Sequence, residues 1–208
     1  ITTDKSSYAI ETPQGDKVSG ADRSELLTAS YEQGRRAEKS IEASAEETTP
    51  QYLFQKLYAA ATVLYGHVEK AAYRTYLIPL LFFKRISDVY DEETEDAIKE
   101  YGVDGAKFMG NSIHSFMIPD GYHWNDIRNA TENVGKVIAD TLAKIEQSNP
   151  KTLGGVFSSF DSAAWANKVI LSDELLKNLI EKMSEINVGN KAYSADVMGD
   201  AYEYLLKQ

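Results

Sequence analysis

The sequence predicts a mainly α-helical fold that contains one short extended or hairpin segment. Apolar residues recur at spacings of three and four along most of the chain after residue 50, which is the pattern of amphipathic helices. Of the 208 residues, 43% are hydrophobic, which suffices for one ordinary domain with a buried core. Charged residues make up 26%, so the chain as a whole does not have the composition of a disordered protein.

Residues 1–50 differ in character from the rest of the chain. They are polar, and their few apolar positions lie far apart, so they are predicted to form a polar N-terminal arm or a solvated helix. Thr48, Thr49 and Pro50 interrupt the pattern and indicate a domain boundary. Residues 51–208 are predicted to form one helical domain.

The first two helices of this domain are predicted at residues 52–65 and 69–91, separated by Gly66. The second is apolar nearly all round in its middle, which is typical of a helix at the centre of a domain. Pro79 lies inside it and is expected to kink or interrupt it, because proline removes a backbone donor. The acidic stretch at residues 91–96 is interpreted as the solvated first turn of a next helix.

Residues 102–121 are predicted to be loop-like and to hold the extended or hairpin segment at residues 116–119. Three amphipathic helices follow, with a turn-rich link after the first. Asn149 and Pro150 end the first of them, and Ser172 is the expected N-cap of the second. The predicted ranges are 126–147 for the first helix, 153–160 for the link, and 173–187 and 196–208 for the last two helices.

Several kinds of active site lack the residues they need. The absence of cysteine excludes disulfides, cysteine nucleophiles and zinc–cysteine sites. His67, His114 and His123 stand in no metal-binding spacing, and neither a G-x-S-x-G nor a G-x-x-x-x-G-K-[ST] motif occurs. The acidic residues at 91–96 lack the glycine turn of a calcium loop. We therefore assign no catalytic, cofactor-binding or metal-binding residue.

Charge and hydropathy limit the partners. The longest strongly apolar run, residues 76–83, is far too short to span a bilayer, and we expect a cytoplasmic protein. The formal net charge is -10, with 6 basic and 10 acidic residues in 1–50 and 16 and 22 in 51–208. Proteins that hold duplex DNA through their own surface are usually basic. Any DNA contact is therefore expected from a local patch or through a partner.

Four motifs resemble those of one family. In chain order they are LIPLLFFKRISD at 77–88, FMIP followed by a tryptophan at 116–124, IEQSNPKTLGGVF at 145–157, and MGDAYEYL at 198–205. Together they resemble the N-terminal helical domain of the modification (methyltransferase) subunit of type I restriction-modification systems. The resemblance covers about residues 53–208, and residues 1–50 match no part of it.

The resemblance implies a function for the parent protein. Subunits of this family transfer a methyl group from S-adenosylmethionine to N6 of adenine in DNA. Two of them join a specificity subunit, and a restriction subunit can be added. The N-terminal helical domain would serve assembly and DNA clamping. The Rossmann-like catalytic domain would follow it and is absent from this chain, so S-adenosylmethionine is expected to bind the full-length protein and not this segment. The one Asn-Pro pair, Asn149-Pro150, is followed by Lys151 and not by the second proline of the catalytic motif.

Three basic residues are candidates for contacts with DNA or a partner: Arg74, Lys84 and Arg85, which share one predicted helix. The alternative is that Lys84 and Arg85 pair with Asp88 and Glu92 at helical spacing. For the whole chain, the alternative to a methyltransferase domain is a stand-alone helical adaptor that binds a protein partner and has no enzymatic activity.

Overall fold

The computed structural model describes residues 48–160 and 162–207. Thr48–Gln208 forms one compact unit. The arm or helix predicted for residues 1–50 lies almost entirely outside the described residues. The mainly α-helical prediction is confirmed, because every regular element within the described ranges is a helix and none is a strand.

The first helix, α2 (Pro50–Val63), begins two residues before its predicted start at residue 52 and ends two residues before its predicted end at residue 65. The hydroxyl oxygen of Thr49 accepts a hydrogen bond from the Tyr52 N–H at 3.2 Å. Pro50 opens the helix, where its missing N–H leaves no internal bond unmade. Leu53 and Leu57 lie on one side of the helix and are fully buried. The apolar stripe therefore determines which face packs inward.

The next helix, α3 (Tyr73–Met109), follows the 3-10 turn η1 (Lys70–Ala72) and is longer than predicted. The expected interruption at Pro79 is wrong: the helix continues through it, and the non-helical backbone lies at Gly102 (φ 73°, ψ 170°). An internal proline costs about 3 kcal/mol. Burying Phe83 and each apolar neighbour contributes about 1.5–3 kcal/mol per side chain. Burial therefore outweighs the lost hydrogen bond.

The second half of α3 corrects two further predictions. The acidic stretch at residues 91–96 lies in the middle of the helix, so it is not the first turn of a separate one. The loop predicted for residues 102–121 is wrong in its first part, because α3 runs to Met109 and the 3-10 turn η2 (Gly110–Ile113) follows. Gly102 adopts a positive φ that glycine reaches without strain, which lets the helix change direction there.

Residues 114–123 contain no strand, so the segment at 116–119 is irregular and forms no hairpin. Asn149 holds this segment in place. Its side-chain oxygen accepts the Met117 N–H at 2.8 Å, and its side-chain nitrogen donates to the Met117 carbonyl at 2.8 Å. A side-chain amide thus satisfies the backbone groups that a partner strand would have paired with.

The single helix predicted at residues 126–147 is divided into α4 (Trp124–Arg128) and α5 (Val134–Ser148). Asn133, which precedes α5, has a φ of 53°. The carboxylate of Asp173 accepts hydrogen bonds from the N–H groups of Asn133 at 3.1 Å and Val134 at 2.9 Å. An acceptor from a distant segment therefore stabilises a new helix start, which local periodicity could not reveal.

The last three helices are α6 (Ser162–Trp165), α7 (Asp173–Ser184) and α8 (Ala195–Leu206). The sequence pattern did not predict α6, which is a single turn. The two final predicted helices are confirmed, with ends that differ by a few residues. The Ser172 hydroxyl accepts the Leu175 N–H at 3.1 Å, which confirms the predicted N-cap.

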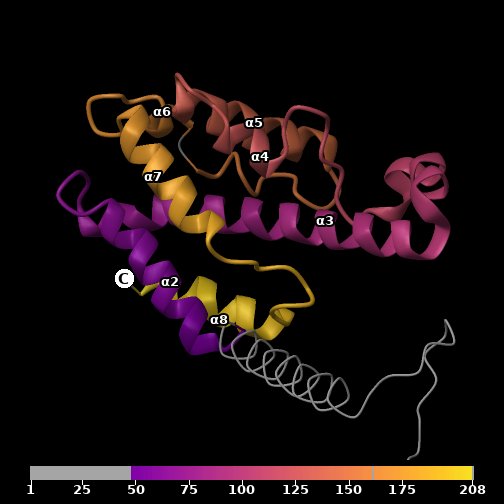
Figure 1. The fold of residues 1–208 in the computed structure, drawn as a ribbon. Coiled ribbons are helices and arrows are strands. Elements are labelled where there is room, and N and C mark those ends of the chain that lie inside the picture. The colour runs from indigo at the N-terminus through magenta and orange to yellow at the C-terminus, as the bar shows by residue number, and fades with distance from the viewer. Residues whose placement is uncertain (1–47, 161, 208) are drawn as a thin grey trace, which may run out of the picture. The chain divides into compact units, whose positions relative to one another are not determined.

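The helix α3 is the central element of this unit (Figure 1). Figure 1 shows α2 and α8 on one side of it and α4 and α5 on the other. The helix α7 packs against α2 as well as against α4 and α5, so it joins the two sides. One continuous core of buried apolar side chains runs through these helices. In the part of the chain that the structure describes, no helix is both long and apolar enough to cross a membrane.

Candidate functional site

Charged residues on α3 hold the loop that connects α7 to α8 (residues 185–194, the α7–α8 loop). Arg85, Asp88 and Glu92 each form hydrogen bonds with backbone groups of this loop. Spacings of three and four place these three side chains on neighbouring positions of one helix face. Two segments about a hundred residues apart in the sequence are therefore joined by charge-assisted hydrogen bonds.

Lys84 is enclosed beside this contact and is only 6% exposed. Its Nζ lies 2.5 and 2.6 Å from the two carboxylate oxygens of Asp88, and 5.6 Å from the ring centroid of Trp124. Asp88 also accepts the Val188 N–H at 2.7 Å. The pairing of Lys84 with Asp88 at helical spacing is thus confirmed, and the ammonium group is bound inside the domain.

Arg85 reaches into the α7–α8 loop. Its guanidinium donates to the carbonyl oxygens of Val188 and, at 3.0 Å, of Tyr193, and to the side-chain oxygen of Asn190. Burial lowers the pKa of Arg85 from its ordinary value. Its partners are loop atoms and not carboxylates of α3, so the predicted pairing along the helix is wrong for Arg85.

Glu92 completes the contact one turn further along α3. Its carboxylate accepts the N–H of Asn190 at 2.7 Å and that of Lys191 at 3.1 and 3.2 Å. Gly189 passes so close that a Cβ at this position would overlap the carboxylate. A side chain at position 189 would therefore have to displace the Glu92 carboxylate from its hydrogen bonds. Lys191 in turn places its Nζ 2.5 Å from Asp96.

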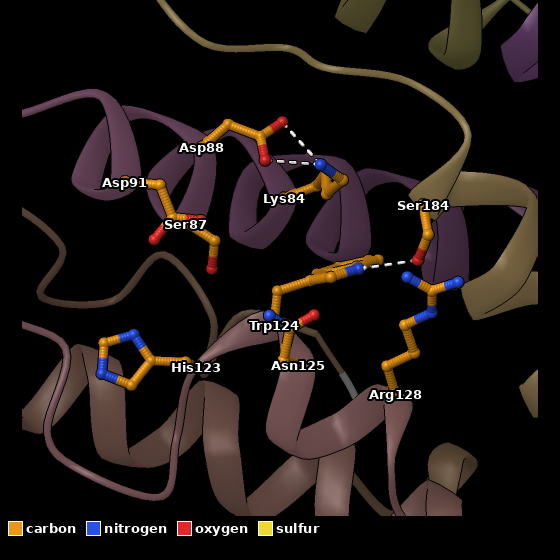
Figure 2. Close-up of a pocket in the computed structure, with 9 residues that line it drawn as sticks. All are labelled: Lys84, Ser87, Asp88, Asp91, His123, Trp124, Asn125, Arg128 and Ser184. Carbon is orange, nitrogen blue, oxygen red and sulfur yellow. Dashed lines mark hydrogen bonds and ion pairs between the residues drawn. The ribbon is translucent and has the colours of Figure 1, made fainter. Parts of the chain in front are cut away.

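A cavity of about 260 Å³ lies beside these contacts, between α3, α4 and the end of α7. Figure 2 shows Ser87 and Asp91 pointing from α3 toward the side where His123 and Trp124 lie. The Trp124 Nε1 donates to the Ser184 hydroxyl at 2.8 Å, which fixes the orientation of the indole ring. The lining residues are Lys84, Ser87, Asp88, Asp91, His123, Trp124, Asn125, Arg128 and Ser184.

Two polar groups that line this cavity have no partner. Ser87 is 2% exposed, and its hydroxyl oxygen is buried without a hydrogen bond. Asp91 forms no ion pair or hydrogen bond within the described part of the chain. Desolvation, and then the charge of Asp88, raise the pKa of Asp91 above its ordinary value. Nowhere in residues 48–160 and 162–207 does a group of three or more His, Asp or Glu side chains form that could hold a metal.

Aromatic and imidazole rings pack near this part of α3. The rings of Tyr90 and His114 are stacked with centroids 3.5 Å apart, and His123 meets Tyr90 edge-on at 5.1 Å. Burial lowers the pKa of His114, while Glu93, whose oxygen lies 3.5 Å from Nδ1, opposes that shift. A neutral, packed imidazole suits a structural histidine, which agrees with the lack of metal-binding spacing in the sequence.

Arg74 differs from the other two candidate contact residues. It lies in the first turn of α3, is exposed, and makes no ion pair within the described residues. The structure therefore does not gather Arg74, Lys84 and Arg85 into one basic patch. Sequence reasoning also missed Ser87 and Asp91. The available signal was a serine at the centre of an apolar helix, where a polar side chain needs a partner.

A second set of polar contacts fixes the turn after α5. The Glu146 carboxylate accepts the N–H groups of Gly155 at 3.1 Å, Phe157 at 2.7 Å and Ser158 at 2.7 Å. Burial alone would raise the pKa of Glu146, but these bonds together hold it below its ordinary value. The ionised form of this carboxyl group therefore stabilises the turn.

Comparison with known proteins places the chain in a family. A sequence model described as the HsdM N-terminal domain matches residues 53–183, which is more than half of the chain. A comparison with curated proteins finds no match. The matched segment runs from within α2 to the penultimate residue of α7, and it includes the α3 residues that hold the α7–α8 loop and every cavity-lining residue except Ser184. The chain therefore belongs to the HsdM N-terminal domain family, the N-terminal domain of modification subunits of type I restriction-modification systems.

Proposed function

We propose that this segment is the assembly and DNA-clamping domain of a site-specific adenine-N6 DNA methyltransferase subunit that acts in the cytoplasm. The observation that carries the proposal is the family match over residues 53–183. The internal anchoring of the domain supports it, because Arg85, Glu92 and Asn149 each connect segments that lie far apart in the sequence. A rigid helical body is what a clamp requires.

We assign the methyl-transfer reaction to a part of the parent protein other than the described residues. Methyltransferases of the Rossmann type hold S-adenosylmethionine at a glycine-rich turn between a strand and a helix. The described residues contain no strand. We therefore expect the cofactor and the flipped adenine to bind in a separate catalytic domain. The partners of the full protein would be a specificity subunit, a second modification subunit and a restriction subunit.

Among the three basic candidates, Arg74 is the one we assign to a DNA phosphate. Its guanidinium is exposed and makes no ion pair within the described residues. Lys84 and Arg85 are bound to Asp88 and to the α7–α8 loop, so their role is to stabilise the domain. With a net charge of -10, the chain would meet DNA only when a partner supplies most of the electrostatic attraction.

The test uses the native full-length polypeptide that contains this segment, co-expressed with a specificity subunit from the same source. We expect a stable complex that transfers methyl groups from S-adenosylmethionine to adenine in DNA. Arg74→Glu should weaken DNA binding evenly across sequences and lower the slope of log K against log salt by about one or more. Lys144→Glu, an exposed and unpaired lysine on α5 in the described structure, serves as the charge-matched control.

Two outcomes would contradict the proposal. A native protein that binds no specificity subunit and methylates no DNA would favour the stand-alone helical adaptor. Alternatively, the complex could form normally while Arg74→Glu and Lys144→Glu bind DNA as tightly as the unmodified protein does. That result would support the assembly role and would contradict the assignment of Arg74 to a DNA phosphate.

A further inference from the structure

The cavity between α3 and α4 has an unbalanced charge. Its lysine, Lys84, is neutralised by Asp88. Its arginine, Arg128, donates to both carboxylate oxygens of Glu181, at 2.8 and 2.7 Å. Asp91 is an exposed lining carboxylate that forms no ion pair in the described part of the chain, although the charges of His123 and Lys84 act on it.

The hydroxyl of Ser87 adds a second, independent observation. The side chain is 2% exposed and faces the cavity, yet its oxygen has no hydrogen-bond partner (Figure 2). A buried hydroxyl without a partner costs about 1–3 kcal/mol, so such groups are usually satisfied by a ligand or an ordered water. Asp91 lies one helical turn from Ser87, and Figure 2 shows both side chains directed to the same side of α3.

We propose that this cavity binds a guanidinium group, with the Asp91 carboxylate as its counter-ion and the Ser87 hydroxyl as a second acceptor. The volume of about 260 Å³ accommodates such a group together with part of its aliphatic stem. This proposal stands on the geometry of the cavity and does not depend on the DNA-methyltransferase function.

Guanidinium fits better than a compact ammonium group for two reasons. Its five N–H donors spread over a planar fork, so one group can reach a carboxylate and a hydroxyl that lie a helical turn apart. It also stacks on aromatic rings, and the cavity wall includes the imidazole of His123 and the indole of Trp124. An anion is disfavoured because the two cations of the wall already have carboxylate partners.

The first experiment is an NMR titration of the 208-residue chain at pH 8 with N-acetyl-arginine methylamide. The matched neutral probe is the citrulline derivative, which keeps the shape and loses the charge. We expect the amide signals of Ser87, Asp91 and Asn125 to shift with the arginine probe, and at least tenfold weaker binding of the citrulline probe. Equal binding of the two probes, or no shift at these residues, would overturn the proposal in favour of a water-filled cavity.

Variants locate the site. Asp91→Asn should weaken binding of the arginine probe about tenfold or more, and Ser87→Ala severalfold, because each removes one acceptor. Asp104→Asn, an exposed carboxylate near the far end of α3, should leave binding unchanged. Ser87→Ala also removes an unsatisfied hydroxyl, so folding should be preserved. Inorganic phosphate that shifts the same signals, or Asp91→Asn that binds as tightly as the unmodified chain, would contradict the assignment.

The guanidinium could come from an arginine of a partner subunit or from a free small molecule. Repeating the titration on the assembled complex separates these sources. If a partner arginine fills the cavity, the probe should no longer bind in the complex. If the source is a free molecule, binding should persist. Failure to assemble would count against the proposed function only, because the titration of the isolated chain tests by itself whether the cavity binds a guanidinium group.

Discussion

The two halves of α3 share one helix but lie in opposite environments. In the first half, apolar side chains such as Leu80 and Phe83 are fully buried, and charged groups bond to the α7–α8 loop. In the second half, Tyr101 is 50% and Phe108 is 93% exposed. Figure 1 shows this second half extending past α5 and α8. Aromatic content alone therefore does not tell which half of a helix belongs to the core.

The difference teaches where the stability of this domain resides. A helix is stabilised mainly by tertiary packing of its apolar face and only weakly by propensity. The first half packs on both sides and adds charge-assisted hydrogen bonds to the α7–α8 loop. The second half contacts that loop only at its start, through Glu92 and Asp96, and beyond them it meets mainly η2 and the nearby turn. Substitutions of the same kind should therefore have unequal effects in the two halves.

The largest expected effect comes from a matched pair of phenylalanines. Phe83→Ala should reduce the free energy of unfolding by about 3–5 kcal/mol, because it leaves a cavity in the core. Phe108→Ala should change it by no more than about 0.5 kcal/mol, because its ring is exposed. Urea unfolding followed by circular dichroism measures both. Similar losses would mean that the distal half of α3 is packed in solution.

The buried ion pair gives the next effect. Asp88→Ala should lower the free energy of unfolding by about 3 kcal/mol, because it leaves Lys84 enclosed without a counter-ion. The double variant Lys84→Met with Asp88→Ala should be less destabilised than Asp88→Ala alone. Thermal unfolding compares the two. A double variant that is worse than the single one would show that the lysine contributes more than its pairing.

Two glycines test the contact between α3 and the α7–α8 loop. Gly189→Ala should destabilise by about 1–3 kcal/mol, since its Cβ would displace the Glu92 carboxylate and leave backbone N–H groups unpaired. Gly199→Ala, in α8 with open space around the added Cβ, should be neutral or stabilise by up to about 1 kcal/mol. The denaturant concentrations at the unfolding midpoints of the two variants and the unmodified protein measure both effects. If Gly189→Ala were neutral, the loop would not depend on Glu92.

The smallest effect concerns an exposed ion pair at the start of the same loop. Hydrogen bonds from Lys182 and then from Lys56 lower the pKa of Glu185 to about 2. A carboxyl whose folded pKa lies below its unfolded value stabilises the protein above the unfolded value and loses that contribution as pH falls. Stability should therefore decline between about pH 4.5 and 2, and Glu185→Gln should flatten part of this decline. An unchanged pH profile would show that this surface pair is screened.

Several parts of the fold followed from local sequence signals. Ser172 acts as the predicted N-cap of α7, because a cap needs only residues three positions away. The pairing of Lys84 with Asp88 was likewise predictable from helical spacing. Other predictions failed where distant residues intervened. The helix predicted at residues 126–147 is divided because Asp173 caps a new helix at Val134.

The sequence by itself determined the helical class, the family, and the burial of the apolar middle of α3, because periodicity and motif order are local properties of the chain. Only the tertiary structure decided what the charged residues of α3 do. Arg85 and Glu92 bond to a loop about a hundred residues away, and Ser87 and Asp91 line a cavity whose other wall comes from His123 and α4. Such pairings depend on which segments the packed core brings together, and no pattern along α3 encodes that choice.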